Sequence, residues 1–162
     1  MEETKGSILN GMHFLCAEDN DLNAEILRSM LDLKGASCVI CSNGKQVVEA
    51  FEESEPDQYD AVLMDVQMPV MNGYEASRRI RTSRRPFGKT IPIIALTANA
   101  FAEDIVRSSE AGMDAHITKP IDENKLKRVY AAAACKSMRY LENIMFHVKT
   151  YEESPEKIRA FF

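Results

Sequence analysis

Residues 61–76 read AVLMDVQMPVMNGYEA, and this stretch holds the clearest indication of the fold. Its first four residues form an apolar run without polar alternation, which is typical of a strand buried on both faces of a parallel sheet. The run stops abruptly at Asp65, and a proline and the Asn72-Gly73 pair then indicate a loop. Apolar residues resume at helical spacing from Tyr74. The stretch therefore predicts a strand, a loop and a helix, with one isolated carboxylate where the strand ends.

The same alternation of short apolar runs and amphipathic stretches continues on both sides of this segment. Further strands are expected at residues 12–17, 37–41, 91–96 and 115–118. Helices are expected over about residues 22–34, 44–51, 74–82, 102–111 and 122–133. Five strand–helix units in about 120 residues predict an α/β fold, a parallel sheet covered by helices on both faces. Right-handed crossovers make a doubly wound five-stranded sheet the favoured topology.

The composition is that of an ordinary soluble globular domain. The 162 residues include 20 Lys+Arg against 25 Asp+Glu, which gives a net charge of −5. This mild acidity disfavours nucleic acid or an anionic membrane as the main partner, because both select basic surfaces. No apolar run approaches the roughly 18 residues that span a bilayer, and the N-terminus lacks the apolar region of a signal peptide. We therefore expect a cytoplasmic location.

Four cysteines, at positions 16, 38, 41 and 135, are too few for a disulfide scaffold. Cys38 and Cys41 form a C-x-x-C pattern, but the Val39-Ile40 pair between them indicates a buried strand. No second ligand pair at zinc spacing follows, and a thioredoxin-like pair would lie at a helix N-terminus. We therefore expect structural thiols.

Polar residues of a particular kind follow four of the predicted strands. Glu18 and Asp19 follow the first strand, Asp65 the third, Thr97 the fourth and Lys119 the fifth. The carboxyl ends of parallel strands share one edge of the sheet, where ligands of doubly wound folds bind. Two carboxylates 4 Å apart repel by about 4 kcal/mol at an effective dielectric constant near 20, so a cation must be present. Oxygen ligands without His or Cys favour Mg²⁺ over zinc.

A carboxylate beside Mg²⁺, an ammonium and a hydroxyl is the set of groups that phosphoryl transfer to an aspartate requires. Asp65 is the best candidate for the nucleophile because it stands alone after a central apolar strand. Glu18 and Asp19 come as a pair, which suits metal binding.

Four segments in this order and spacing resemble the receiver domain of two-component response regulators. They are CAEDNDLNAEIL (16–27), AVLMDVQMPVMNGYEA (61–76), IPIIALTANAF (91–101) and AGMDAHITKPID (111–122). The segments LMDVQMPVMNGYEA and ALTANAF are most similar to the receivers of hybrid sensor histidine kinases. The resemblance covers residues 11–135, leaves 1–10 and 136–162 as N- and C-terminal extensions, and implies a flavodoxin-like sheet of strand order 2-1-3-4-5.

The resemblance also implies a role for each polar residue. Asp65 would accept a phosphoryl group from a phosphohistidine, and Glu18, Asp19, Asp65 and the backbone carbonyl of Gln67 would hold Mg²⁺. Glu18 departs from the family's pattern, in which Asp is common at this position, and this departure would alter the metal geometry slightly.

Three further positions complete the implied machinery. Thr97 would be the switch hydroxyl, Lys119 would pair with the phosphoryl group, and the Lys119–Pro120 bond would be cis. His116 occupies the switch position where the family has an aromatic residue. Phosphorylation would then shift the face built from strand four, helix four, strand five and helix five.

The implied partners are a histidine kinase domain, in the same full-length chain or another one, and a histidine phosphotransfer protein. A receiver catalyses its own phosphorylation and dephosphorylation, and we expect no kinase catalytic domain in this chain. The chain would lie in the cytoplasm, either as a separate protein or as the cytoplasmic part of a membrane-bound hybrid kinase. The main alternative is a degenerate receiver that acts only as a docking or dimerisation module.

Two other classes of protein share parts of this pattern of strands and polar residues. A haloacid-dehalogenase-type phosphatase needs a D-x-D motif, whereas this chain has Asp65-Val66-Gln67. A flavodoxin-like cofactor binder needs a phosphate loop after the first strand, where residues 18–21 (EDND) would repel the phosphate.

The C-terminal extension continues an apolar stripe through Met138, Leu141, Ile144, Met145 and Val148. We expect it to prolong the last helix and to support a homodimer through helix five and the extension, with folding back or disorder as the other outcomes. A basic run is expected to form a solvated face or, alternatively, a surface for an acidic partner. It comprises Arg78, Arg79, Arg81, Arg84 and Arg85.

Overall fold

Five parallel strands form one sheet in a computed structural model that describes residues 7–99 and 101–135. The strands are β1 (His13–Ala17), β2 (Ser37–Cys41), β3 (Ala61–Asp65), β4 (Ile93–Thr97) and β5 (Ala115–Thr118). Their spatial order is β2-β1-β3-β4-β5, with every neighbouring pair parallel. The doubly wound sheet and its order are therefore confirmed.

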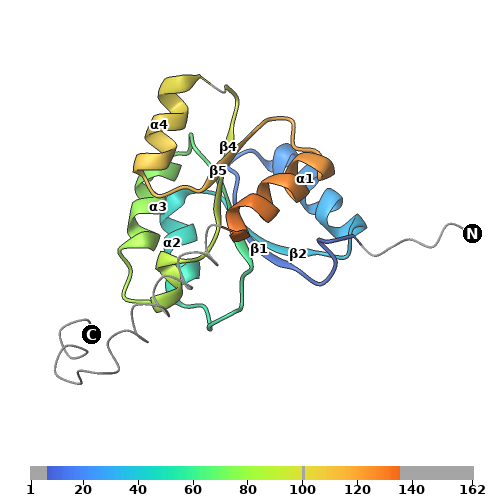
Figure 1. Ribbon diagram of the computed structural model, residues 1–162, viewed down its shortest axis with the longest axis horizontal. Coiled ribbons are helices and arrows are strands. Elements are labelled where there is room, and N and C mark those ends of the chain that lie inside the picture. The colour runs from blue at the N-terminus through green and yellow to red at the C-terminus, as the bar shows by residue number, and fades with distance from the viewer. Residues whose placement is uncertain (1–6, 100, 136–162) are drawn as a thin grey trace, which may run out of the picture.

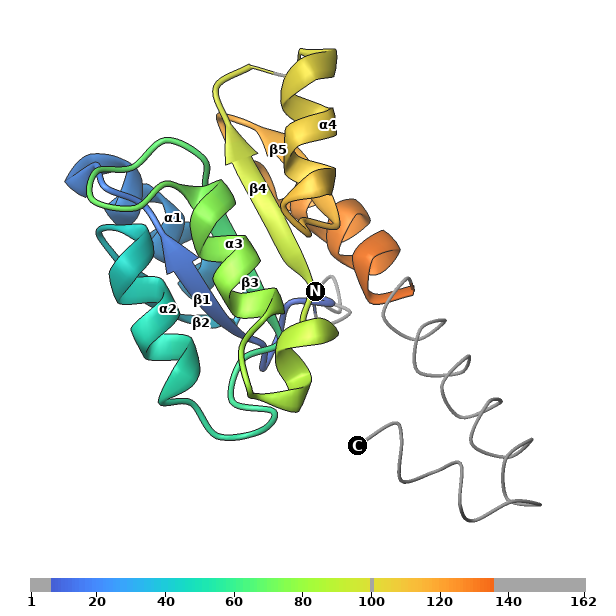
Figure 2. The same ribbon diagram turned by 90° about the vertical axis from the view of Figure 1, so that its left-hand side faces the viewer.

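A helix follows each strand, and the helices cover both faces of the sheet. They are α1 (Asp21–Leu33), α2 (Gly44–Glu52), α3 (Gly73–Arg81), α4 (Ala102–Glu110) and a helix at residues 123–135, with a short 3₁₀ turn η1 (Pro86–Lys89) before β4. Figure 1 shows α1 and helix 123–135 on one face and α2, α3 and α4 on the other. Seen from the latter side in Figure 2, α2, α3 and α4 lie in front of the sheet.

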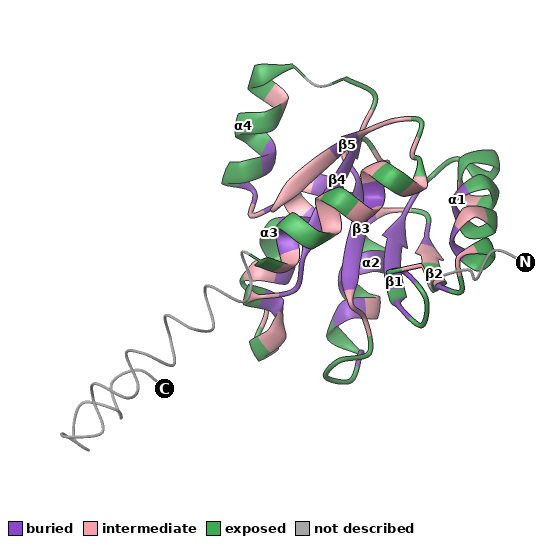
Figure 3. Ribbon diagram, turned by 45° about the vertical axis from the view of Figure 1, so that its right-hand side comes forward, coloured by how far each residue is buried: buried purple, intermediate pink, exposed green. Residues whose placement is uncertain are grey.

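The three central strands carry the core. All residues of β3, and all but one residue each of β1 and β4, are buried. Figure 3 shows the colour of buried residues in the middle of the sheet. One apolar cluster packs β1, β3 and β4 against α2 and α3, and a second packs them against α1 and helix 123–135. The rigid sheet thus holds the carboxyl ends of β1, β3 and β4 at fixed positions.

Side-chain caps fix where the helices begin. Asn20, Asn43 and Asn72 each accept a hydrogen bond from the backbone N–H three residues further on, at 2.9 Å. Asp122 does the same for Lys125 N at 2.8 Å. Such caps depend on local sequence alone, because a short polar side chain reaches the backbone N–H three residues further on.

Helix α1 presents its apolar residues on two sides. Leu27 and Leu31 are buried, whereas Leu22, Ile26 and Leu33 are 70%, 58% and 82% exposed. The sequence shows helical spacing for all of them, and only the packing on β1 and β2 decides which stripe faces the core.

The prediction of a solvated basic face is wrong for Arg81. Its guanidinium donates to the carbonyls of Gly112, Gly88 and Ile91 and to Asp114 Oδ2, at 2.7–2.9 Å. Its side chain is only 17% exposed. Arg81 therefore ties α3 to η1, to the segment between η1 and β4, and to the turn before β5, because one guanidinium can satisfy several carbonyls at once.

The outer boundaries remain predictions. Leu9, inside the expected N-terminal extension, is fully buried in the core cluster beneath α1. The expected C-terminal extension at 136–162, with its helix and its dimer contact, lies outside the described residues.

Candidate functional site

Asp65 is the last residue of β3, the central strand, and only 6% of its surface is exposed. Its Oδ1 accepts a hydrogen bond from the backbone N–H of Gln67 at 3.2 Å. Its Oδ2 accepts one from the ammonium of Lys119 at 3.0 Å. The sheet and the following loop thus hold this carboxylate in one orientation at the strand end, with one oxygen toward each donor.

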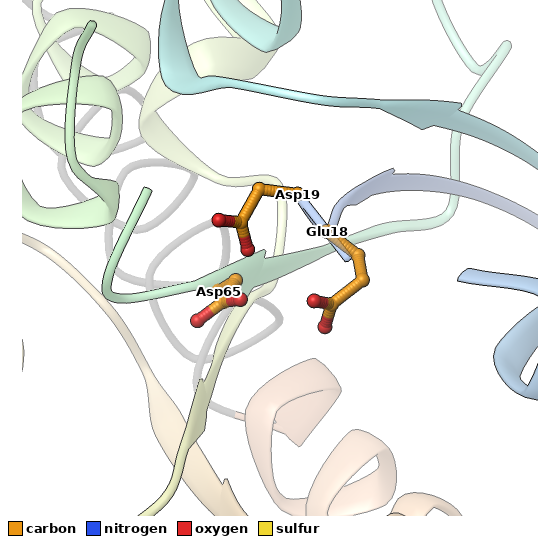
Figure 4. A group of neighbouring side chains, drawn as sticks. All are labelled: Glu18, Asp19 and Asp65. Carbon is orange, nitrogen blue, oxygen red and sulfur yellow. The ribbon is translucent and has the colours of Figure 1, made fainter. Parts of the chain in front are cut away.

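Two more carboxylates reach the same point from the end of β1. Glu18, Asp19 and Asp65 each offer an oxygen atom, and these atoms all lie within 4.8 Å of one another. Figure 4 shows the three side chains gathered at the ends of β1 and β3. Glu18 is buried and Asp19 is exposed, so the cluster spans the boundary between the core and solvent. The predicted gathering of these carboxylates is therefore observed.

Lys119, which follows β5, supplies the positive charge. Its Nζ lies 2.8 Å from Glu18 Oε2 and 3.0 Å from Asp65 Oδ2. Burial acts to lower the pKa of Lys119, but its hydrogen bonds to Glu18 and Asp65 and their charges together raise it. Burial raises the pKa of Asp65, and the Glu18 charge adds to this, while Lys119 and the Gln67 N–H oppose it. The lysine therefore stays an ammonium and offsets part of the carboxylate repulsion.

The donor set fits a hard divalent cation. Three carboxylate oxygens converge within coordination reach of one ion, and one of the three residues opens to solvent, which can complete the coordination shell with water. No His or Cys belongs to this group among the described residues, which disfavours a soft metal. The acidic cluster can therefore bind a metal ion.

Most of the predicted site residues line a cleft of about 690 Å³ at this edge of the sheet. Glu18, Asp65, Gln67, Thr97 and Lys119 all line it. Thr97 ends β4, and its hydroxyl donates to the Asn99 carbonyl at 2.7 Å.

Two predictions concern the strand and loop beside the cleft. His116 lies in β5, half-buried, beside Ala95 of β4. The Lys119–Pro120 bond is cis, as the resemblance implies.

A model of the response regulator receiver domain matches residues 14–131. The chain belongs to this family. The receiver domain is 40% identical over 129 residues to "Probable histidine kinase 2" of Oryza sativa subsp. indica, and the match covers 73% of this chain and 12% of that one. It is 38% identical over 136 residues to "Hybrid signal transduction histidine kinase I" of Dictyostelium discoideum, covering 83% of this chain and 8% of that one. The chain thus spans a small fraction of the relatives' length.

Solved structures show the same fold. The receiver domain of a sensor histidine kinase from Pseudomonas aeruginosa, with a magnesium ion in its active-site cleft, is 38% identical with a TM-score of 0.66. The match covers 74% of this chain and 94% of that one. A Saccharomyces cerevisiae structure pairs the histidine phosphotransfer protein Ypd1 with the receiver domain of its downstream response regulator Ssk1. That match has 29% identity and a TM-score of 0.67, covering 76% of this chain and 89% of that one.

Every helix in the described part of this receiver domain is too short or too polar to traverse a bilayer.

The roles of two residues of the receiver site were not predicted from the sequence. A Cβ on Gly73 would lie 2.3 Å from the backbone oxygen of Asp65, so only glycine lets α3 approach the acidic residue this closely. The backbone N–H of Asn20 donates to Glu18 Oε1 at 3.2 Å while its side chain caps α1. The Asn-Gly pair before α3 and the Asn before α1 are local signals for a turn and a cap, and only the fold places them against the carboxylates.

Proposed function

We propose that this receiver domain accepts a phosphoryl group onto Asp65 from a phosphohistidine of a histidine kinase, in a Mg²⁺-dependent reaction. One observation supports it above all others. The Asp65 carboxylate lies in an acidic cleft, within 4.8 Å of the Glu18 and Asp19 oxygens, and is hydrogen-bonded to the Lys119 ammonium. An isolated surface aspartate has none of these neighbours.

The chemical step is a displacement at phosphorus. An Asp65 carboxylate oxygen attacks, the P–N bond to the donor imidazole breaks, and its electron pair returns to the imidazole nitrogen, which takes up a proton. The product is an acyl phosphate. When bound by Glu18, Asp19, Asp65 and the Gln67 carbonyl, Mg²⁺ supplies positive charge for the phosphoryl oxygens.

Lys119 supplies the second positive charge. Its ammonium contacts both Glu18 and Asp65, so it already lies where a phosphoryl oxygen on Asp65 would be. Exchanging the Glu18 contact for a phosphoryl oxygen keeps the lysine paired, with little reorganisation of the site.

Thr97 couples this step to a surface change. Its hydroxyl now donates to the Asn99 carbonyl in the loop that leads to α4. Phosphorylation adds nearly two negative charges and three acceptor oxygens. We infer that the Thr97 hydroxyl exchanges its bond to Asn99 for one to the phosphoryl group. The released loop and His116 then move, and the face of β4, α4, β5 and helix 123–135 changes.

The partners follow from the chemistry. The donor is a histidine kinase domain, since the relatives are histidine kinases. A histidine phosphotransfer protein is the second partner, by analogy with the Ypd1 complex. We infer a location in the cytoplasm, where ATP supplies the kinase, either as a separate protein or as the cytoplasmic part of a membrane-bound hybrid kinase. A docking module without phosphorylation is disfavoured because all the site positions carry groups able to act.

Intact-mass measurement tests the proposal. The protein is incubated with a small phosphodonor such as acetyl phosphate, with Mg²⁺ or with a chelator. We expect one added phosphoryl group with Mg²⁺, and none with the chelator or in Asp65→Asn. The matched control is Asp57→Asn, since Asp57 is exposed in the loop before β3 and should leave phosphorylation unchanged. Equal phosphorylation of Asp65→Asn would overturn the assignment.

A further inference from the structure

Strand β2 lies at one end of the sheet and has a neighbouring strand, β1, on one side only. Figure 3 shows β2 at the end opposite β5. The backbone N–H of Ser37 donates to the Met12 carbonyl at 2.9 Å, and the Cys41 carbonyl accepts from the N–H of Glu18 at 3.0 Å. The first and last residues of β2 thus direct their backbone groups toward β1.

The residues between them fix the direction of the remaining backbone groups. Alternate residues of a strand direct these groups to the same side, so Val39 also faces β1. Cys38 and Ile40 therefore direct their N–H and C=O groups outward. Within residues 7–99 and 101–135, no group forms a hydrogen bond with these outward atoms. The outer edge of β2 is an open row of backbone donors and acceptors.

Val39 adds an apolar surface beside this open edge. Its side chain is 46% exposed, and it is the one exposed large apolar residue that lies in a strand of the described chain. Cys38 and Ile40 direct their side chains to the other face of the sheet, where they pack against the apolar cluster beneath α1. The edge therefore offers both hydrogen bonds and apolar contact to a further strand.

The sequence of β2 lacks the features that protect most edge strands. Edge strands of natural proteins usually carry charged residues or proline, which discourage pairing with another chain. The opposite edge strand β5 follows this rule, with Asp114 before it and the Lys119-Pro120 pair after it. The β2 segment, residues 35–43 (GASCVICSN), contains neither a charged residue nor a proline. The two edges of the sheet thus differ in how readily they accept a strand.

A second copy of β2 fits this edge by symmetry. When two β2 strands run antiparallel about a two-fold axis through Val39, Cys38 of each copy lies opposite Ile40 of the other. These residues then exchange N–H···O=C bonds on both sides of the axis, and the two Val39 side chains meet as a close non-hydrogen-bonded pair. No like charges face each other in this register, because the segment carries no charge.

We propose that the β2 edge is an interface between two copies of this chain, which join their sheets into one through antiparallel β2 strands. The interface is isologous, since the same residues serve both copies. One strand pair buries less area than a standard stable interface, so the dimer is a weak one that forms at high local concentration. Asp65 takes no part in it, and the proposal is independent of phosphorylation.

A cysteine at the axis tests the pairing directly. In Val39→Cys, combined with Cys135→Ser to remove the exposed thiol, the two introduced sulfur atoms face each other at a separation that a disulfide spans. After mild oxidation we expect a covalent dimer whose tryptic peptide 35–45 is linked through position 39 to the same peptide of the second copy. Val106→Cys in the same background is the control, at an apolar α4 residue that is 54% exposed, and should remain a monomer.

Sedimentation of the uncrosslinked protein supplies a second readout. The wild type should shift from monomer toward dimer between about 10 μM and 1 mM. Val39→Lys should raise the dissociation constant at least about tenfold, because two ammonium groups then meet at the axis, while Val39→Thr and Val106→Lys should leave it within a few-fold.

Three results would each overturn the proposal. They are a wild type that stays monomeric throughout this concentration range, cross-linking of Val39→Cys no faster than that of Val106→Cys, and a dimer that Val39→Lys leaves unchanged. The last result would place the contact on another surface, such as the one predicted for the C-terminal extension.

Discussion

Replacing Gly73 by alanine places a methyl group against the residue that we propose as the phosphoryl acceptor. The new Cβ would lie 2.3 Å from the backbone oxygen of Asp65 and 3.0 Å from Met64 Cγ and Val66 Cα. Restoring ordinary contact requires the helix or the strand end to move by about 1 Å, and overpacking of this kind costs roughly 1–3 kcal/mol. Because alanine is a better helix former than glycine, it offsets up to about 1 kcal/mol of this overpacking cost. We therefore expect a net loss of about 1–2 kcal/mol in the free energy of unfolding.

The effect on phosphorylation should be larger than the effect on stability. A nucleophile displaced by about 1 Å can lose roughly a hundredfold in rate. Urea unfolding measures the loss of stability, and the time course of phosphorylation by acetyl phosphate with Mg²⁺ measures the loss of phosphorylation rate.

Gly44→Ala is the matched control. Gly44 also begins a helix, and its Cβ would lie 2.4 Å from the Met71 oxygen, a clash of similar severity that spares Asp65. We expect a similar loss of stability with a phosphorylation rate within a few-fold of wild type. Wild-type stability and rate in Gly73→Ala, or an equal loss of rate in both variants, would contradict the close approach of α3 to Asp65 as the cause.

Three other perturbations have expected outcomes in urea unfolding. Val70 adopts φ +67° and is 78% exposed, so Val70→Gly should stabilise the protein by about 1 kcal/mol, whereas Val106→Gly inside α4 should destabilise it by about 0.3–0.5 kcal/mol; destabilisation by Val70→Gly would contradict the strain. Arg81→Met leaves Asp114 without its guanidinium and should cost about 2–4 kcal/mol, whereas Arg79→Met, at an exposed pair, should cost under about 0.5 kcal/mol; equal losses would contradict the buried clamp. Burial raises the pKa of Asp65 above its unfolded value, so this group's stabilising contribution is full below the unfolded pKa and lost as pH rises through the folded pKa. With a chelator present, the stability of Asp65→Asn relative to wild type should therefore increase as pH rises from acid to neutral; a relative gain at acid pH instead would contradict the raised pKa of Asp65.

Features that depend on neighbouring residues in the sequence were predictable. The run 61–64 is apolar throughout and forms a strand buried on both faces. Asn43 and Asp122 cap helices because their side chains reach the backbone three residues on. The acidic cluster was predictable too, since parallel strands deliver their carboxyl ends to one edge of the sheet.

Features that depend on the partner elements were not predictable. Arg81 lies in a basic run like its neighbours, and only the folding of η1 and of the segments before β4 and β5 against α3 gives it four oxygen partners. Leu22 and Leu27 of α1 are equally apolar, and the tilt of the helix on the sheet exposes one and buries the other. Gly73 resembles a turn glycine until the fold brings it against Asp65.

The position of the phosphoryl group decides between this site and any other. After phosphorylation with acetyl phosphate and Mg²⁺, sodium borohydride reduces an aspartyl phosphate to homoserine and so marks the residue permanently. We expect homoserine at Asp65 in tryptic peptide 46–78, with Asp57 and Asp60 of the same peptide unchanged. Homoserine at another aspartate, or a phosphorylated protein in which Asp65 stays intact, would contradict the assignment of Asp65 as the acceptor.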